Sequence, residues 1–232
     1  MNIAIILSGG VGSRMGGNVP KQYIEVCGKP VIWYCLKTFL ECVIVDAVII
    51  VVADEWKLYI ERLLIGLGCE KMVLYSAPGE TRQYSIYNAL KVLKTNHVGC
   101  DDKIIIHDAA RPLVSAQLIE NCLNSCEEFD AVLPVIPVKD TLYQSTDGQH
   151  ITTLLNRNEL FAGQAPEAFR FSKYLALHVK MPREELLKIN GSTEIAYKGG
   201  MSVKLIRGEE INFKITTHED LSNFENIIKH RI

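Results

Sequence analysis

The sequence has 232 residues, of which 48% are hydrophobic, so it is long and apolar enough for one large α/β domain, and a disordered or fibrous protein is excluded. Its 25 basic and 27 acidic side chains give a formal charge of −2, too little to hold the protein on nucleic acid or on an anionic membrane. Seven scattered cysteines without a C-x-x-C pair favour reduced, packed thiols over a zinc site. Because the net charge is so small, any anion must be bound by a local site.

The first residues, MNIAIILSGG, give no sign of a targeting segment. About six apolar residues precede the glycines, fewer than a secretion signal needs and far fewer than the roughly 20 that span a bilayer. We therefore expect a cytoplasmic protein.

Short runs rich in Ile and Val alternate with helical patterns over the first 140 residues. The expected strands are 3–7, 47–53, 72–76, 103–107 and 131–138. The expected helices are 30–42, 55–68, 81–94 and 115–129. Because the strand patterns are continuously apolar, both faces of the sheet should be buried, as in a doubly wound, mostly parallel α/β fold.

The alternation stops after residue 138. Two alternating segments around an STDG turn predict a β-hairpin arm over 139–160, which we interpret as an interaction device. The remaining chain predicts a helix at 171–179, strands at 202–206 and 212–217, and a closing helix at 218–230. We find no repeat or linker, so the sequence predicts one domain, 1–232, with an arm.

A glycine-rich stretch, SGGVGSRMGGNVPK (8–21), follows the first strand. Glycines there allow positive φ and leave room for a polyphosphate near the backbone N–H groups. Met15 breaks the dinucleotide fingerprint, and Asn18 breaks the P-loop pattern. What remains is a bare backbone with two cations, Arg14 and Lys21, which suits a triphosphate that loses pyrophosphate.

A second motif, HDAARP, begins at the end of the strand at 103–107. Asp108 at a strand's carboxyl end can hold Mg²⁺ that bridges phosphates, and ligands of such sheets bind at that edge. Arg111 follows in the next turn. We interpret His107 as a packed core histidine without chemistry.

Six segments together carry a resemblance that spans nearly the whole chain: SGGVGSRMGGNVPKQY, PGETRQYSIYNAL, IIIHDAARP, PVKDT, NRNELFAGQAPEAF and NFKITTHEDL. In order and spacing they resemble the cytidylyltransferases that act on methylerythritol phosphate and on ribitol phosphate. The resemblance implies a Rossmann-like nucleotidyltransferase sheet of the GT-A-like kind. It also implies transfer of CMP from CTP to a polyol phosphate with release of pyrophosphate, dependence on Mg²⁺ or another divalent cation, and a homodimer formed through the arm.

The resemblance also implies roles for individual residues. The nucleotide would be bound by Ser8, Gly9, Gly10, Gly12, Gly79, Glu80, Arg82 and Ser85, with Glu80 where the family usually has aspartate. Catalytic charge would come from Arg14, Lys21 and Lys214. The acceptor would be bound by Asp108, which also holds the metal, by Arg111, and by Thr141 and Arg157 from the arm of a partner subunit.

A phosphate monoester is already an anion at neutral pH, so this reaction needs placed positive charge rather than a general base. Three alternatives stay open: a sugar-1-phosphate nucleotidyltransferase, a non-catalytic nucleotide-binding module and, less favoured, a nicotinamide oxidoreductase. The acceptor is also open. NGSTEIAYKGG (190–200) stands where many methylerythritol-phosphate enzymes have an acidic segment like TDDAS, which slightly favours ribitol phosphate or another polyol phosphate used for a cell-surface polymer.

Overall fold

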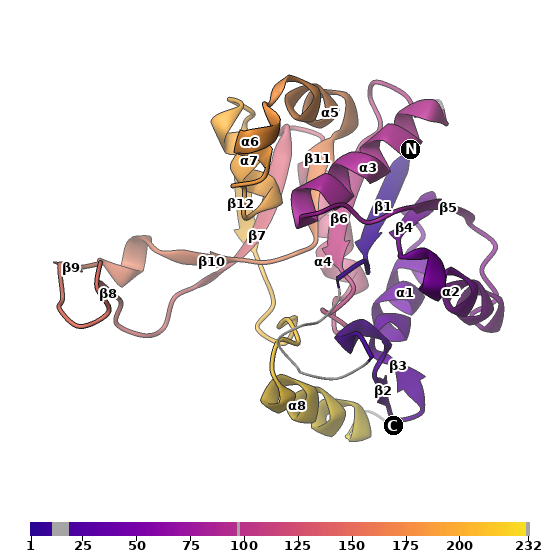
Figure 1. Cartoon of the computed structure of the whole chain (residues 1–232), viewed down its shortest axis with the longest axis horizontal. Coiled ribbons are helices and arrows are strands. Elements are labelled where there is room, and N and C mark those ends of the chain that lie inside the picture. Colours follow the sequence, from indigo (N-terminus) through magenta and orange to yellow (C-terminus); the bar gives the residue numbers. More distant parts are fainter. Residues whose placement is uncertain (11–18, 97, 231–232) are drawn as a thin grey trace.

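The apolar runs of the sequence form an eight-stranded sheet at the centre of the molecule (Figure 1). The computed structural model describes residues 1–10, 19–96 and 98–230. The strands follow the order β10-β7-β11-β6-β1-β4-β5, and β12 also pairs with β7. Their bounds are β1 Asn2–Leu7, β4 Ala47–Val51, β5 Met72–Ser76, β6 Lys103–Asp108, β7 Ala131–Pro137, β10 Phe161–Gly163, β11 Glu167–Arg170 and β12 Val203–Arg207.

Most neighbouring strands are parallel, as the sequence predicts. β1 pairs in parallel with β4 and β6, β4 with β5, and β7 with β12. Only β10 and β11 run against their neighbours. The parallel strands therefore bring their carboxyl ends to one edge, where Leu7, Val51 and Asp108 end their strands.

Helices cover both faces of the sheet. Alternate residues of the central strands face opposite sides, so Ile6, Ile50 and Ile105 pack with α1, α2 and α4, while Ile5 and Ile49 pack with α3, α5 and α7. The helices are α1 Val31–Glu41, α2 Asp54–Gly66, α3 Arg82–Thr95, α4 Ala116–Ser125, α5 Phe171–Lys180, α6 Arg183–Leu186, α7 Ser192–Lys198 and α8 His218–Lys229. The 3₁₀ turns are η2 Lys21–Tyr23 and η3 Arg157–Glu159, and β2 Glu25–Val26 pairs with β3 Lys29–Pro30.

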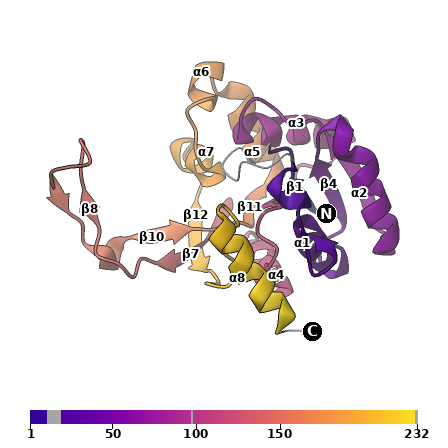
Figure 2. The same ribbon diagram turned by 60° about the horizontal axis from the view of Figure 1, so that its bottom comes forward.

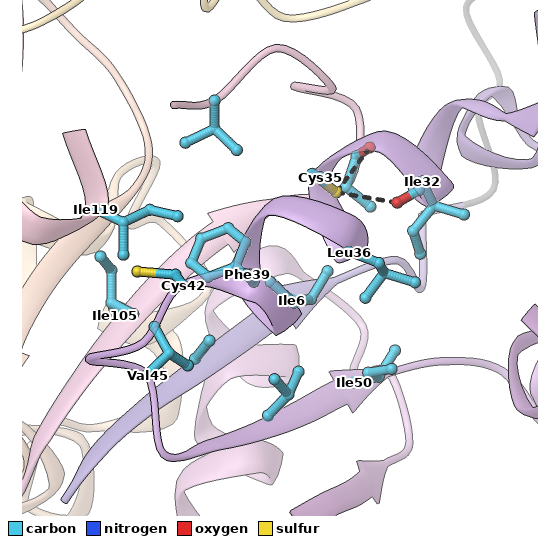
Figure 3. Packing of buried hydrophobic residues seen from close by; sticks show 14 of the residues in the cluster. Ile6, Ile32, Cys35, Leu36, Phe39, Cys42, Val45, Ile50, Ile105 and Ile119 are labelled. Atoms are coloured by element: carbon cyan, nitrogen blue, oxygen red, sulfur yellow. Dashed lines mark hydrogen bonds between the residues drawn. The ribbon is translucent and has the colours of Figure 1, made fainter. Parts of the chain in front are cut away.

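The cysteines lie partly in this core. Figure 3 shows Phe39 of α1 and Cys42, which follows this helix, packed among Ile105 and Ile119. Cys35, Cys42, Cys122 and Cys126 are buried, and all seven cysteines are free. Burial raises the pKa of the Cys35 thiol to about 12, so the thiol stays protonated at neutral pH. The free cysteines agree with the predicted reduced thiols, and the predicted packing holds for the four buried cysteines.

One predicted strand is wrong. Residues 212–217 are irregular, because their backbone pairs with a loop rather than with a strand: Ile215 N donates to Ala110 O at 2.8 Å. The two apolar residues of the pattern, Phe213 and Ile215, pack in the cluster of Phe224 of α8, with Ile215 fully buried. The other predicted helices and strands agree with the structure within a few residues, apart from shorter ends such as Ser125 for the helix at 115–129.

The arm leaves the sheet between two paired strands. β7 and β10 are antiparallel, with Pro137 opposite Phe161, and the intervening chain extends far from the sheet (Figures 1 and 2). At its end β8 Tyr143–Gln144 pairs with β9 Thr153–Leu154, which confirms the predicted hairpin. Tyr143, Ile151 and Leu154 on this hairpin are more than half exposed.

No helix within the described ranges is both long enough and apolar enough to cross a lipid bilayer.

Candidate active site

Two loops meet above the carboxyl end of β1. Gly9 follows β1, and a Cβ added to it would lie 2.4 Å from the Cβ of Pro78 in the loop that follows β5. A Cβ on Gly79 would lie 2.4 Å from the Cβ of Tyr84 and 2.9 Å from the backbone nitrogen of Ser85 in α3. Both glycines are therefore required for the close approach of the loops to each other and to α3.

Buried polar side chains hold the first loop in place. Ser8 Oγ donates to Val51 O at 2.7 Å, and the Gln22 amide donates to the carbonyls of Ser8 and Gly10 at 2.6 and 2.8 Å. Ser8 and Gln22 are both almost fully buried. The Ser8 hydroxyl thus points into the sheet, and the structure does not bring it to the cavity described next.

The two loops enclose a cavity of about 420 Å³ at the edge of the sheet. Among the residues predicted to bind nucleotide or to supply charge, those that line it are Gly9, Gly10, Lys21, Gly79, Glu80, Arg82, Ser85, Asp108 and Lys214. Gly12 and Arg14 lie outside the described residues. The cavity thus collects predicted residues that are up to about 200 positions apart in the sequence.

The N-terminal end of α3 forms one side of this cavity. Thr81 caps the helix by accepting from Tyr84 N, and Gly79 N donates to Ser85 Oγ at 2.9 Å. Glu80 accepts from Arg183 of α6, and both side chains of that ion pair are more than 60% exposed. The Glu80 carboxylate is therefore tied to α6 at the rim of the cavity.

Asp108, at the end of β6, is the centre of a cluster of charges. Its Oδ1 accepts from Arg82 Nε at 3.0 Å and its Oδ2 from Lys214 Nζ at 2.8 Å. Arg111 Nε lies 3.9 Å from Oδ2. Burial opposes ionisation, but the three cations outweigh it and hold the pKa of Asp108 well below its ordinary value, so Asp108 is a carboxylate at any physiological pH.

Arg82 uses all three guanidinium nitrogens. Besides Asp108, it donates to Ser192 Oγ at the start of α7 and to Glu167 Oε1 at 3.3 Å. Its positive charge is therefore paired with two carboxylates within the protein. Among the described residues, Lys214 and Arg111 form ion pairs with the same carboxylate, Asp108. The three cations Arg82, Arg111 and Lys214 thus face two carboxylates, Asp108 and Glu167, and the cluster has a net positive charge.

A second cavity, of about 740 Å³, adjoins the same cluster. Arg82, Asp108 and Lys214 line both cavities. Its remaining wall combines apolar and polar side chains: Arg111, Leu133, Gln164, Ala165, Glu167, Asn190, Thr193, Glu194, Tyr197, Val203 and Leu205, with Gly163 and Gly191. The three charged residues thus stand between a nucleotide-sized cavity and a separate, partly apolar one.

Arg111 is fixed at the border of the second cavity. Its Nη1 donates to Asn212 O at 2.7 Å, whereas its buried Nε has no hydrogen-bond partner among the described residues. The guanidinium is therefore held beside Asp108, where its positive charge can attract an anion in the cavity.

The two arm residues predicted to bind acceptor lie elsewhere. Thr141 and Arg157 are exposed, line neither cavity, and belong to the arm that extends away from the sheet (Figure 1). Arg157 Nη1 donates to Lys139 O at 3.0 Å within the arm. Within one chain, the structure does not bring them to the other site residues.

His107 is the packed histidine that the sequence predicts. It is fully buried against Phe39, with ring centroids 5.1 Å apart, and its Nε2–H donates to Arg111 O at 2.9 Å. Burial lowers the pKa of His107 to about 4, so the ring is neutral and supports the backbone of Arg111.

Sequence patterns did not single out Glu167, Gln22 or Asn212, which all hold the site together. Each is a buried polar residue, and Asn212 Nδ2 donates to Ala165 O at 2.7 Å behind the second cavity. Their only sequence signal is that Gln22 and Asn212 stand beside predicted site residues and that Glu167 interrupts an apolar strand pattern. The sequence alone does not show which polar side chains are buried.

Comparisons with known proteins show the family of the chain. The family model described as IspD, 2-C-methyl-D-erythritol 4-phosphate cytidylyltransferase, matches residues 2–230. Two similar relatives carry the same description: one from Clostridium botulinum is 37% identical over 218 residues, with 94% of this chain and 95% of the relative covered, and one from Clostridium perfringens is 36% identical over 228 residues, with 98% of both covered.

Solved structures show the same fold. A crystal structure of 4-diphosphocytidyl-2C-methyl-D-erythritol synthase from Anaerococcus prevotii superposes with a TM-score of 0.82 at 24% identity, covering 98% of this chain and 96% of that one. The predicted nucleotidyltransferase fold is confirmed. With the family match over nearly the whole length, the chain belongs to the IspD family of 2-C-methyl-D-erythritol 4-phosphate cytidylyltransferases and is a CTP-dependent nucleotidyltransferase that acts on a polyol phosphate.

Proposed function

We propose that the acceptor is 2-C-methyl-D-erythritol 4-phosphate and that the enzyme converts it, with CTP, to 4-diphosphocytidyl-2-C-methyl-D-erythritol and pyrophosphate in the cytoplasm. The observation that carries the proposal is the shared wall of the two cavities, formed by Arg82, Asp108 and Lys214. The relatives described by this acceptor support the assignment. They outweigh the slight preference for ribitol phosphate that segment 190–200 suggested.

The triphosphate lies in the 420 Å³ cavity, against the backbone of Gly9 and Gly10 and beside Lys21. An oxygen of the acceptor phosphate attacks the α-phosphorus of CTP, forming one P–O bond, while the bond to the β-phosphate breaks and pyrophosphate leaves with the electron pair. Lys214, on the wall between the cavities, stabilises the negative charge that develops on the α-phosphate. Arg14 and Lys21 stabilise the leaving pyrophosphate.

Arg111 and Asp108 orient the acceptor from the second cavity. Arg111 fits an acceptor oxygen, because its guanidinium lines the second cavity and carries a positive charge beside Asp108. Asp108 is a carboxylate and accepts from an acceptor hydroxyl. Neither residue removes a proton from the nucleophile, since the phosphate monoester is an anion at neutral pH.

The residues of the site fit a divalent cation such as Mg²⁺. No group of three or more His, Cys, Asp or Glu side chains that could hold a metal occurs within residues 1–10, 19–96 and 98–230. Of the two carboxylates that line the nucleotide cavity, Asp108 would hold the cation, because Glu80 is paired with Arg183 at the rim. Mg²⁺ in nucleotide sites is commonly held by one or two carboxylates together with substrate phosphates, and Asp108 lines the cavity where the triphosphate lies. When bound, the cation neutralises phosphate charge.

The arm completes the acceptor cavity of a partner subunit in a homodimer. The hairpin of β8 and β9 is too small to be stable alone, and Tyr143, Ile151 and Leu154 expose apolar surface on it. In the dimer, Thr141 and Arg157 would bind the phosphate of the acceptor held by the other subunit. This explains why one chain leaves both residues away from its own cavities.

The test is pyrophosphate release with CTP and Mg²⁺, measured in parallel with 2-C-methyl-D-erythritol 4-phosphate, ribitol 5-phosphate and two sugar 1-phosphates. We expect turnover with the first acceptor at a kcat/KM at least about 10²-fold above the others, since an unfilled polar site is penalised strongly. Turnover mainly with ribitol 5-phosphate would keep the reaction and replace the acceptor. Turnover only with a sugar 1-phosphate would overturn the proposal.

A further inference from the structure

Helix α7 forms one wall of the second cavity, through Thr193, Glu194 and Tyr197. The helix has only seven residues, and Gly191 before it offers no side chain to cap its first turn. Segment 190–200 contains no aspartate that could cap it locally. The start of α7 therefore needs a hydrogen-bond acceptor from another part of the chain.

Glu167, the first residue of β11, supplies that acceptor. Its Oε2 accepts from the backbone nitrogen of Thr193 at 2.9 Å and from Thr193 Oγ1 at 2.6 Å. The side chain is 8% exposed, and a carboxylate this well buried makes stronger hydrogen bonds than it would in water. The position of α7 thus depends on a residue of the central sheet.

The other oxygen of Glu167 connects α7 to the charged cluster. Oε1 accepts from Arg82 Nη2 at 3.3 Å, and Arg82 Nη1 in turn donates to Ser192 Oγ. Because Arg82 Nε also donates to Asp108, one continuous chain of hydrogen bonds runs from α7 through Glu167 and Arg82 to Asp108. Both carboxylate oxygens of Glu167 thus bind groups of the protein itself.

We propose that Glu167 is a positioning residue for acceptor binding: it fixes α7 and Arg82 together, so that the wall of the second cavity is aligned with the reacting groups. The role rests on the proposed function of that cavity. Glu167 lines the second cavity but not the nucleotide cavity, so its loss should affect the acceptor and spare CTP. Arg82 keeps its bond to Asp108 without it.

The first test is the kinetics of Glu167→Gln, which keeps the shape of the side chain and removes its charge and one acceptor oxygen. Because the amide and hydroxyl of Thr193 lose a charged acceptor, we expect the KM for the polyol phosphate to rise roughly tenfold while the KM for CTP changes less than about twofold. Thr193→Val should act in the same direction, and Thr193→Ser, which keeps the hydroxyl, should behave as wild type. The double variant with Glu167→Gln and Thr193→Val should be less affected than the product of the single effects, because both disrupt one contact.

A second measurement does not depend on the acceptor. Hydrogen exchange of the peptide that contains Thr193 should be roughly tenfold faster in Glu167→Gln than in wild type, because the Thr193 amide loses a charged acceptor. Unchanged exchange, or equal rises of both KM values, would overturn the positioning role. If wild type turns over no polyol phosphate, the proposed function fails, and the exchange experiment still decides whether Glu167 fixes α7.

Discussion

Lys214 Nζ lies 2.8 Å from Asp108 Oδ2, and this pair stands on the wall that the two cavities share. The lysine comes from the irregular segment after β12 and the aspartate from the end of β6, so the pair exists only in the folded protein. Asp108 thus holds the ammonium at the border of the two cavities, which in the proposed reaction is where the α-phosphate and the acceptor phosphate meet.

Replacing Lys214 should therefore slow the chemical step. We expect Lys214→Ala to lower kcat by about 10²- to 10³-fold, as for the loss of one stabilising donor, and Lys21→Ala to act similarly on the leaving group. Steady-state pyrophosphate release measures the effect. Lys37→Ala is the control, because Lys37 contacts Glu41 and the Trp33 ring, lines neither cavity, and its loss should leave kcat unchanged. Normal turnover in a folded Lys214→Ala protein would remove this lysine from the mechanism.

Because Gly79 is closely packed, we expect that adding a side chain there weakens the binding of CTP. In Gly79→Ala the new methyl group would lie 2.4 Å from the Tyr84 Cβ, so the loop must move out of the cavity wall. Overpacking costs about 1–3 kcal/mol, so we expect CTP to bind roughly tenfold more weakly by calorimetry.

Gly66→Ala provides the matched control for that variant. Gly66 ends α2, and a Cβ there has open space around it, so affinity for CTP should be unchanged. Equal CTP affinity in both variants and wild type would show that the loop adapts without cost.

From the proposed role of the arm we expect a change in Arg157 to affect binding of the polyol phosphate but not of CTP. Arg157→Ala should raise the KM for the polyol phosphate at least about tenfold and leave the KM for CTP nearly unchanged, because a lost charge-assisted contact affects only the ligand it touches. His150→Ala, also exposed on the arm, is the control and should change neither. Equal changes in both constants would indicate that Arg157 only supports the arm.

Because two histidines are buried, we expect the free energy of unfolding to decrease in mild acid. Burial lowers the pKa of His107 and of His178 from 6.5 to about 4, so the unfolded chain binds more protons than the native protein between these values. The free energy of unfolding should therefore be largest above pH 6.5 and decrease as the pH falls from about 6.5 to about 4. Each histidine contributes up to about 3 kcal/mol over that range.

Replacing one histidine tests the origin of this decrease. His178 packs against Tyr87 and Tyr174, with a ring separation of 4.5 Å from Tyr174, so phenylalanine can take its place. His178→Phe should show a smaller drop in melting temperature between pH 7 and pH 4.5 than wild type. An identical drop would assign the acid sensitivity to His107 or to carboxylates such as Asp130.

The sequence predicts the sheet well, because strands such as 103–107 are buried on both faces and therefore read as unbroken apolar runs. It predicts most of the nucleotide cavity through Gly9, Gly79 and Lys214, because the family motifs retain them. It fails at 212–217, where Phe213 and Ile215 alternate with Lys214 because the apolar side chains pack near α8 and the lysine faces the site, not because the segment pairs in a sheet. Glu167 was missed because only tertiary contacts with Arg82 and Thr193 give it a role.

The pairing of Pro137 with Phe161 at the base of the arm has a practical consequence. Because the arm leaves and returns at adjacent strands, a protease cut at its exposed turn near Gly148 would leave each half of the arm attached to the sheet, one through β7 and one through β10. The nicked protein should still bind CTP, while its loose hairpin could no longer serve a neighbour. Limited proteolysis would thus separate binding of the nucleotide from use of the acceptor without any change in the sequence.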